Sequence, residues 1–321
     1  MIASSPVAPS LVAVEPGPFV TLQDHGRVGW QRFGVSRSGA MDMDALATAN
    51  ILAGNEPTEA ALEFAHVGGT FRLQATSCRI GIAGGHFAVS VDGRAVRPYT
   101  SATVLRGQTI RIGVARDAIW GYVAVSGGFD IPRQLGSRST HARSGIGGQT
   151  VRAGDVLPLG TDAVMAAPER HLAELPDRRG PVRVVLGPQD DLFTDEAVDL
   201  FRSATFRITP QMDRLGYRLE GPVLQHAQGY NIISDGLVAG CIQVPGSGVP
   251  IVLMRDAQLP GGYPKIATVI GADLGRLAQM RPGTPVRFAV VGLSEAQAVQ
   301  RSFVAAFAAR QAAVSEAPPG M

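Results

Sequence analysis

The sequence predicts a mainly β protein, organised as barrels or sandwiches with a few short helices. Glycine and proline are frequent, at 39 and 22 of 321 residues. Such a density of turn-forming residues favours many short strands over long helices. Between the turns lie short runs rich in β-branched residues, which are typical of strands. Because few stretches carry a helical period, a β barrel or sandwich is the expected architecture.

The predicted strands are short apolar runs bounded by glycine, proline or polar turn residues. They cover residues 71–73, 79–82, 87–91, 109–114, 122–125, 182–186, 241–244, 251–254 and 286–291. They occur in both halves of the chain, so both halves are predicted to be β.

Two helices are predicted from capping residues ahead of apolar runs. Asp42 can cap a helix through residues 45–52, and Gly54 is suited to its C-terminal end. Thr194 can begin a second helix that extends to Phe201, with two acidic residues in the first turn where they favour the helix dipole.

A third helix is predicted near the end of the chain. Ser294 and Gln297 have the spacing of a capping box, in which each side chain satisfies a backbone N–H of the first turn. The apolar residues of one face follow: Val299, Phe303, Val304 and Phe307.

The length predicts two domains, because a single hydrophobic core usually stops growing at about 250–300 residues. Residues 161–181 are polar and contain prolines, which is typical of a linker. The predicted domains are therefore residues 10–165 and 180–310. A short motif at residues 24–29 is echoed at 213–218, which is consistent with two related barrels.

Composition excludes several classes of partner. The net charge is only +2, and no basic cluster exceeds Arg178-Arg179, so neither nucleic acid nor a membrane surface is expected. Cys78 and Cys241 lie in apolar strand-like contexts, which favours inert buried thiols over a disulfide or a metal pair. With no signal-peptide pattern and no apolar run of membrane-spanning length, a cytoplasmic protein is expected.

Familiar catalytic motifs are missing from the sequence. It contains no Walker A pattern, no GxSxG, no HExxH and no CxxC. The six histidines lack metal-ligand spacing, so no metal is expected. Gly127-Gly128 follows an apolar strand as a phosphate loop does, but a double glycine there is more often a turn. The residues alone therefore leave an enzyme and a binding protein both open.

Several ordered motifs nevertheless resemble a known family over nearly the whole chain. They are TLQDHGR at 21–27, GV at 34–35, SGAMD at 38–42, AN at 49–50, GN at 54–55, LE at 62–63, GGF at 127–129, GSRST at 136–140, GPQD at 187–190 and DRLG at 213–216. The strongest block, 240–273, contains IQVP at 242–245 and GGYPKI at 261–266. These motifs resemble the family that comprises the C-type 5-oxoprolinase subunits, KipA and allophanate hydrolase subunit 2, which is related to biotin-dependent carboxyltransferases.

The resemblance implies a fold of two tandem cyclophilin-like β-barrel domains. It also implies a hydrolase function, as one subunit of an ATP-dependent 5-oxoprolinase complex that opens 5-oxoproline to L-glutamate. Two alternatives come from other members of the family. One is a carboxyltransferase subunit that uses carboxybiotin, of the urea or allophanate type, and the other is a KipA-like regulator without enzymatic activity.

The implied partners are other subunits and a small-molecule substrate. The chain carries only the C-type module, so a B-type (KipI-like) and an A-type (lactam-utilisation-like) subunit are expected to complete the enzyme. ATP is expected to bind with, or on, a partner subunit. Under the carboxyltransferase alternative biotin would come from another protein, because no attachment sequence such as Ala-Met-Lys-Met occurs here.

Lys265 is the leading candidate for a catalytic residue. It is the only lysine among 29 Lys and Arg residues, and a lysine ammonium is a compact, movable charge that an arginine does not reproduce. An anion contact or an acid–base role is one interpretation, and a surviving surface lysine is the other. Tyr263 and Asp256 complete the catalytic candidates. Residues 256–260 read DAQLP where the family is expected to have Asp-x-Gln-Thr-Thr, so other contacts of this loop are discounted.

The remaining candidates are predicted to bind substrate. They are Gln243, Pro245, Gln258, Gly261, Gly262, Arg138 and Ser139. Arg138, with the serines on either side of it, can form an anion nest, with a simple turn as the alternative. A structural pair between Asp24 and Arg27 across a turn is also predicted.

Overall fold

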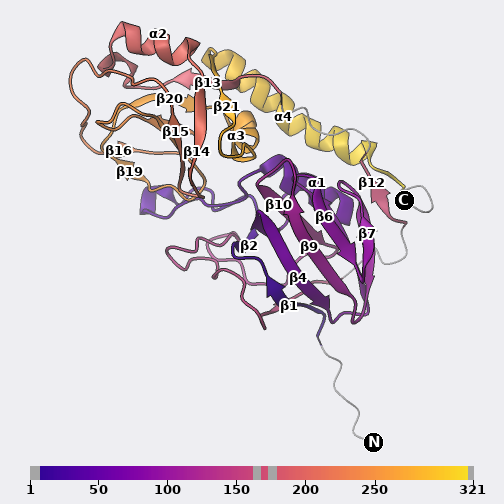
Figure 1. Ribbon diagram of the computed structural model, residues 1–321. Coiled ribbons are helices and arrows are strands. Elements are labelled where there is room, and N and C mark those ends of the chain that lie inside the picture. The colour runs from indigo at the N-terminus through magenta and orange to yellow at the C-terminus, as the bar shows by residue number, and fades with distance from the viewer. Residues whose placement is uncertain (1–7, 162–167, 173–178, 317–321) are drawn as a thin grey trace, which may run out of the picture. The chain divides into compact units, whose positions relative to one another are not determined.

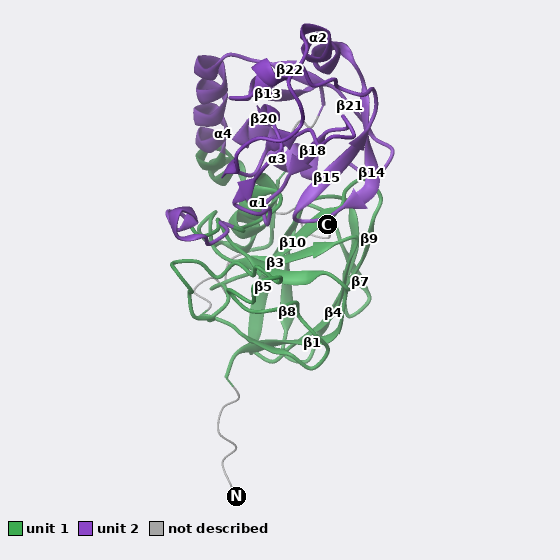
Figure 2. Ribbon diagram, turned by 90° about the vertical axis from the view of Figure 1, so that its left-hand side faces the viewer, with its two compact units in different colours: residues 1–27, 38–176, 307–321 green, residues 28–37, 177–306 purple. Residues whose placement is uncertain are grey.

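The computed structural model describes residues 8–161, 168–172 and 179–316, and strands predominate in it (Figure 1). The chain forms two compact units (Figure 2). Unit 1 comprises Met1–Arg27, Ser38–Pro176 and Phe307–Met321, and unit 2 comprises Val28–Arg37 and Asp177–Ala306. The main division falls inside the predicted linker, of which 162–167 and 173–178 lie outside the described residues. Residues 28–37 are assigned to unit 2 and residues 307–321 to unit 1. A single division point along the sequence cannot predict these two assignments.

Unit 1 contains two antiparallel sheets. The first has six strands in the order β11-β1-β4-β9-β6-β7, and the second has five in the order β2-β3-β10-β5-β8. The strands of the first are β1 (Ser10–Pro16), β4 (Val67–Leu73), β6 (Phe87–Val91), β7 (Arg94–Val96), β9 (Thr109–Ala115) and β11 (Val156–Pro158). Those of the second are β2 (Val20–Gln23), β3 (Ala61–Ala65), β5 (Ser77–Ala83), β8 (Ser101–Leu105) and β10 (Trp120–Val125).

The core of unit 1 is shared by the two sheets. Phe71 and Ile110 from the first sheet and Ile80 and Val123 from the second belong to one cluster of buried apolar side chains. Every residue of β10 is buried, so this strand shows none of the alternation of a half-exposed strand. The reason is α1 (Met43–Ala53), which packs against β10 and β5.

The prediction for α1 is confirmed. Asp42 accepts hydrogen bonds from the backbone N–H groups of Asp44 and Ala45, and Gly54 ends the helix with φ of 93°. The helix approaches β5 so closely that a Cβ at Gly81 would lie 2.1 Å from the carbonyl oxygen of Ala49. Only glycine fits between the helix and the sheet at that position.

Unit 2 is built on one eight-stranded sheet in the order β21-β14-β15-β18-β17-β20-β13-β22. Its strands are β13 (Val182–Leu186), β14 (Phe206–Met212), β15 (Gly216–Glu220), β17 (Cys241–Gln243), β18 (Ile251–Leu253), β20 (Lys265–Val269), β21 (Pro285–Val286) and β22 (Phe288–Val290). Only Arg287 separates β21 from β22, yet these strands occupy the two opposite edges of the sheet. One residue spans at most about 3.6 Å, so the edges meet and the sheet is a nearly closed barrel. The prediction of one continuous strand over 286–291 is therefore wrong, because the chain there forms two short strands separated by Arg287.

Three helices belong wholly or partly to unit 2. α2 (Asp195–Ser203) begins as predicted, with the hydroxyl of Thr194 accepting from the backbone N–H of Ala197. Phe201 of α2 stacks on Phe288 with ring centroids 4.9 Å apart. α3 (Gly271–Ala278) was not predicted, because no side chain caps its first turn.

The last helix, α4 (Leu293–Ala313), confirms the predicted helix but not its first residue. It begins one residue before Ser294, which therefore lies within the first turn and is not the cap. Val304 is 56% exposed, whereas Val299, Phe303 and Phe307 are half-buried at intervals of four residues. Val304 is five residues after Val299 and turns away from that face.

Two pairs of two-residue strands complete the fold. β12 (Arg170–His171) pairs with β23 (Ser315–Glu316) in unit 1, and β16 (Asp235–Gly236) pairs with β19 (Pro260–Gly261) in unit 2. Cys78 and Cys241 are buried, and within the described residues neither forms a disulfide, as predicted. Within the described residues, no helix has the length and apolar character needed to cross a membrane.

Candidate functional site

Lys265 lies at the first position of β20, and its side chain is buried. It is only 3% exposed, and its Nζ atom is 2.6 Å from Oδ2 of Asp235. Burial of an ammonium is costly unless it is paired and hydrogen-bonded. The interpretation of Lys265 as a surface lysine is therefore wrong, and the residue is one half of an ion pair.

Asp235 reaches Lys265 from the short ribbon formed by β16 and β19, which are labelled side by side in Figure 1. Asp235 pairs in register with Gly261, and the backbone N–H of Ile232 donates to the carbonyl of Gly262 at 2.9 Å. The side chain of Asp235 is 51% exposed. Its hydrogen bond from Lys265 is the largest cause that lowers its pKa, followed by a bond from the backbone of Gly236.

Gln189 joins the two members of this ion pair. Its Oε1 accepts from the backbone N–H of Lys265 at 3.3 Å, and its Nε2 donates to Oδ2 of Asp235, also at 3.3 Å. The preceding Gly187 allows this approach, since a Cβ there would lie 2.1 Å from the carbonyl oxygen of Lys265. Gln189 and Asp235 were not among the predicted site residues. The GPQD motif contained Gln189, but no local signal linked Asp235 to Lys265.

Gln243, another candidate, lies close to Lys265. It lies opposite Lys265 in the pairing of β17 with β20, is 3% exposed, and donates from Nε2 to the carbonyl of Tyr263 at 3.2 Å. A Cβ on Gly261 would approach Nε2 of Gln243 to 2.7 Å and a methyl of Leu237 to 2.5 Å. These contacts join several residues into one group, called the Lys265 cluster. Its members are Lys265, Asp235, Gln189, Gln243, Gly261 and the backbone of Tyr263.

The other candidates of unit 2 surround this cluster less closely. Tyr263 directs a side chain that is 41% exposed to the surface. Gly262 is half-buried and Gln258 is exposed. The carbonyl of Pro245 accepts from the backbone N–H of Gly248 at 2.8 Å and so closes the turn after β17.

Asp256 belongs to a separate ion pair. Both of its carboxylate oxygens are bound by Arg214, with Nε–Oδ2 at 2.7 Å and Nη2–Oδ1 at 2.9 Å. The backbone N–H of Asp256 also donates to the carbonyl of Arg214 at 2.7 Å. A bidentate contact with a guanidinium fixes the orientation of both groups, which suits a structural role in joining the DRLG motif to the loop after β18.

Arg138 and Ser139 lie in unit 1, where the predicted nest exists and is filled by the chain itself. The carboxylate of Asp24 accepts from the hydroxyls of Ser137 and Ser139, each at 2.6 Å, and from the backbone N–H of Arg138 at 2.7 Å. Arg27 donates to the carbonyl of Ser139. Both residues of the predicted Asp24–Arg27 pair bind the 137–139 loop.

Burial alone would raise the pKa of Asp24. The bonds from Ser137, Ser139, Arg138 and Gly26 outweigh that effect, so the pKa of this carboxyl is lowered. The side chain of Arg138 is also engaged, with Nε donating to the carbonyl of Ile131 at 2.7 Å and Nη1 to Glu59. Within unit 1, Arg138 and Ser139 thus form a structural nest for Asp24.

Another buried polar group of unit 1 has its partners within the fold. The phenol of Tyr122 donates to Oε2 of Glu63 at 2.6 Å and accepts from the backbone N–H of Asp42 at 2.8 Å. Burial, followed by the charges of Glu63 and Asp42, raises the pKa of Tyr122 well above its usual value. The phenol stays protonated and positions the start of α1, so no catalytic role is assigned to it.

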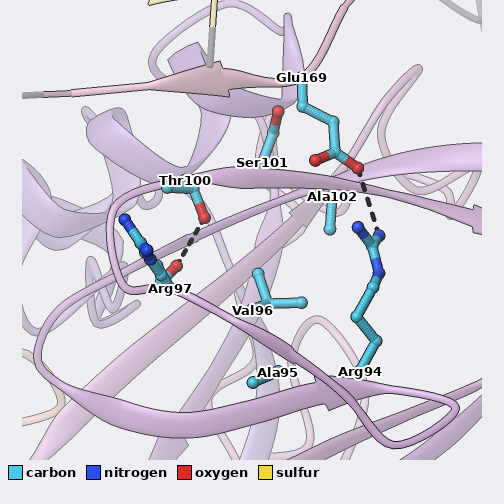
Figure 3. A pocket seen from close by; sticks show the side chains of 8 residues that line it. All are labelled: Arg94, Ala95, Val96, Arg97, Thr100, Ser101, Ala102 and Glu169. Carbon is cyan, nitrogen blue, oxygen red and sulfur yellow. Dashed lines mark hydrogen bonds and ion pairs between the residues drawn. The ribbon is translucent and has the colours of Figure 1, made fainter. Parts of the chain in front are cut away.

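Two cavities of unit 1 differ greatly in size. The first, shown in Figure 3, measures about 10 Å³, which is room for about one water. Its walls include Thr100, which donates to the carbonyl of Arg97 at 2.6 Å, and Arg94, which is 3.4 Å from Glu169. The second measures about 390 Å³ and is bordered largely by residues 147–152 and 155–157. Its ionisable groups, Arg152 and Asp155, lie on exposed loop residues.

Within the part of the chain that the structure describes, no group of three or more His, Cys, Asp or Glu residues is arranged to hold a metal ion. The Lys265 cluster is therefore the strongest candidate site on chemical grounds. It combines a buried cation with two amide side chains, and Gly261 allows Gln243 to approach the backbone closely.

A family model described as "Carboxyltransferase domain, subdomain A and B" matches residues 33–290. The chain belongs to this carboxyltransferase domain family, and the resemblance inferred from its motifs is confirmed.

Within the family, the chain is similar to the C-type subunits of two bacterial 5-oxoprolinases. It is 37% identical over 284 residues to that of Haemophilus influenzae, with 88% of this chain and 91% of the relative covered. It is 36% identical over 292 residues to that of Escherichia coli K12, with 89% and 93% covered. The alignment with this chain thus covers nearly the whole length of both C-type subunits.

Larger multidomain proteins are similar over a fraction of their length. The urea amidolyase of Lachancea kluyveri is 30% identical over 318 residues, which cover 89% of this chain and 17% of that protein. The crystal structure of the K. lactis urea amidolyase superposes with a TM-score of 0.87 at 26% identity, over 99% of this chain and 20% of the other. The mainly β fold expected for the family is confirmed.

Proposed function

We propose that the chain is the C-type subunit of an ATP-dependent 5-oxoprolinase, a hydrolase complex that opens 5-oxoproline to L-glutamate. The observation that carries this proposal is the 36–37% identity to the C-type subunits of two 5-oxoprolinases over about nine-tenths of both lengths. The relatives named urea amidolyase match at 28–30% and contain this region as less than a fifth of a longer chain. The proposed location is the cytoplasm.

The proposed substrate-handling residues are those of the Lys265 cluster. Lys265 provides the positive charge, and Gln243 and Gln189 provide amide groups beside it. Gly261 lets Gln243 approach the backbone, Gly262 is the less crowded glycine at which a ligand is proposed to approach, and the exposed phenol of Tyr263 follows them in the chain. Gln258, Pro245 and Asp256 shape the surrounding loops.

The proposed partners are a B-type (KipI-like) and an A-type (lactam-utilisation-like) subunit. ATP is proposed to bind with, or on, one of these partners, because the sequence has no Walker-type phosphate loop. The ATP then supplies the energy for opening the lactam. This chain's own part is to bind and orient a small anionic substrate.

A reconstitution experiment tests this function. The chain is co-expressed with B-type and A-type subunits from the same organism, and glutamate release from 5-oxoproline is measured with and without ATP. We expect ATP-dependent release by the complex and little or none by the chain alone. Robust turnover by the isolated chain would contradict the proposed division of labour. Urea carboxylation with a biotinylated carrier, in place of glutamate release, would favour the carboxyltransferase alternative.

A further inference from the structure

The two residues of the Lys265–Asp235 ion pair differ sharply in exposure. The side chain of Lys265 is 3% exposed, while that of Asp235 is 51% exposed. Lys265 is part of the eight-stranded barrel, whereas Asp235 lies on a two-residue strand outside that sheet. The cation is therefore fixed, and its partner is a surface side chain that solvent already reaches.

Two donors converge on one oxygen of this carboxylate. Nζ of Lys265 is 2.6 Å from Oδ2 of Asp235, and Nε2 of Gln189 is 3.3 Å from the same atom. Gln189 is held in turn by the backbone N–H of Lys265, which donates to its Oε1. The barrel thus presents a preformed place for one carboxylate oxygen, and this place does not depend on the rest of Asp235.

Electrostatics restricts what can replace Asp235. A buried ammonium that loses its counter-ion pays a large desolvation cost. A neutral ligand therefore cannot displace Asp235 cheaply, whereas a second carboxylate can exchange with it at little net cost. The backbone at the nearby Gly262 is not crowded, because a Cβ there would make only ordinary contacts, with the carbonyl oxygen of Ile232 nearest at 3.5 Å.

We propose that Asp235 is an internal stand-in for the ligand, and that a small-molecule carboxylate takes its place on Lys265 and Gln189. Asp235 is thus a specificity-determining residue, which excludes neutral ligands by competing for the same ammonium. The inference rests on the proposed function for the choice of ligand, since 5-oxoproline carries a carboxylate on its lactam ring. Its test does not depend on turnover.

The sole lysine makes the test direct. The untagged full chain labelled with ¹³C-lysine gives the side-chain resonance of Lys265 alone. We expect 5-oxoproline to shift this resonance in a saturable way. The matched neutral ligand is 2-pyrrolidone, which has the same lactam ring without the carboxylate, and it should leave the resonance unchanged.

The variant Asp235→Asn removes the internal competitor and keeps the size of the side chain. We expect the apparent Kd for 5-oxoproline to fall about threefold or more, because the ligand no longer has to displace the Asp235 carboxylate from Lys265. Asp199→Asn removes one exposed carboxylate from α2 of the same unit, so it controls for the change in net charge and should leave the Kd unaltered.

Three results would overturn the inference. They are the absence of a saturable shift with 5-oxoproline in both the wild type and Asp235→Asn, an equal shift with 2-pyrrolidone, and an unchanged or weaker affinity in Asp235→Asn. The proposed function fails separately, if the reconstituted complex releases no glutamate while the Lys265 resonance still responds to the carboxylate.

Discussion

The 137–139 nest of unit 1 and the Lys265 cluster of unit 2 each hold a carboxylate of the chain, but in opposite settings. In the nest, Asp24, Ser137 and Ser139 are all 3% exposed or less. In the Lys265 cluster, the cation is equally buried while its carboxylate is half-exposed. A carboxylate whose donors are all buried with it serves the fold, whereas an exposed one beside a buried cation can be exchanged. The exposure of the carboxylate therefore distinguishes the structural nest from the proposed ligand site.

The largest effect is expected from Asp24→Ala. The change leaves two buried hydroxyls and the backbone N–H groups of Arg138 and Gly26 without their acceptor, so the free energy of unfolding should fall by about 3–5 kcal/mol. Urea unfolding in a Trp30→Phe background measures this, because Trp120 of unit 1 is then the only tryptophan. Asp235→Ala leaves the buried Lys265 without its counter-ion but removes a half-exposed carboxylate with fewer donors. Its loss should therefore be smaller, about 1–3 kcal/mol, and is followed by circular dichroism because Asp235 lies in unit 2. Equal losses in the two variants would break the comparison.

The second prediction concerns Lys265 in the reconstituted complex. Lys265→Met removes the charge, and Lys265→Arg keeps it but replaces a point donor with a planar fork. Both should lower glutamate release by about tenfold to a hundredfold, as expected for a lost charged hydrogen bond of about 1.5–3 kcal/mol. The control is Arg207→Met, which removes an exposed cation from β14 of the same sheet. Wild-type turnover and KM in both Lys265 variants would refute a role in substrate handling.

A matched glycine pair sharpens the definition of the cluster. The Cβ of Gly261→Ala would overlap Leu237 and the amide of Gln243, which should cost about 1–3 kcal/mol of stability and raise KM as Gln243 moves. The Cβ of Gly262→Ala would make only ordinary contacts, so its stability should stay within about 0.5 kcal/mol of the wild type. Thermal unfolding and steady-state kinetics compare the two variants. Similar behaviour would mean that the close approach at Gly261 is unimportant.

The smallest effect is expected from acidification. The folded-state pKa of Asp24 is lowered, so the unfolded chain binds this proton first. The stability that Asp24 provides is therefore fully present above the unfolded value of about 3.9 and is lost as the pH falls through the lower folded pKa. Urea midpoints of the Trp120 signal between about pH 5 and pH 3 should fall less steeply in Asp24→Asn than in the wild type. An identical slope would show that this carboxyl is not the source of the acid sensitivity.

Local sequence determined the β class, two helix starts and the family of this protein. Asp42 and Thr194 cap helices as predicted, because a cap depends on residues only two or three positions away. The family motifs likewise are continuous runs of sequence. Lys265 could be singled out as the only lysine, and Gln243 could be named as a candidate from the IQVP motif.

Tertiary structure alone decided which groups these residues meet. Lys265 is paired with a carboxylate 30 positions earlier, and the serines of the nest bind an aspartate 113 and 115 positions earlier. The closure of the barrel likewise depends on β21 and β22 reaching opposite edges of one sheet. Strand order and register fix such contacts, and a local run of residues carries no information on either, because register depends on the strand across the sheet.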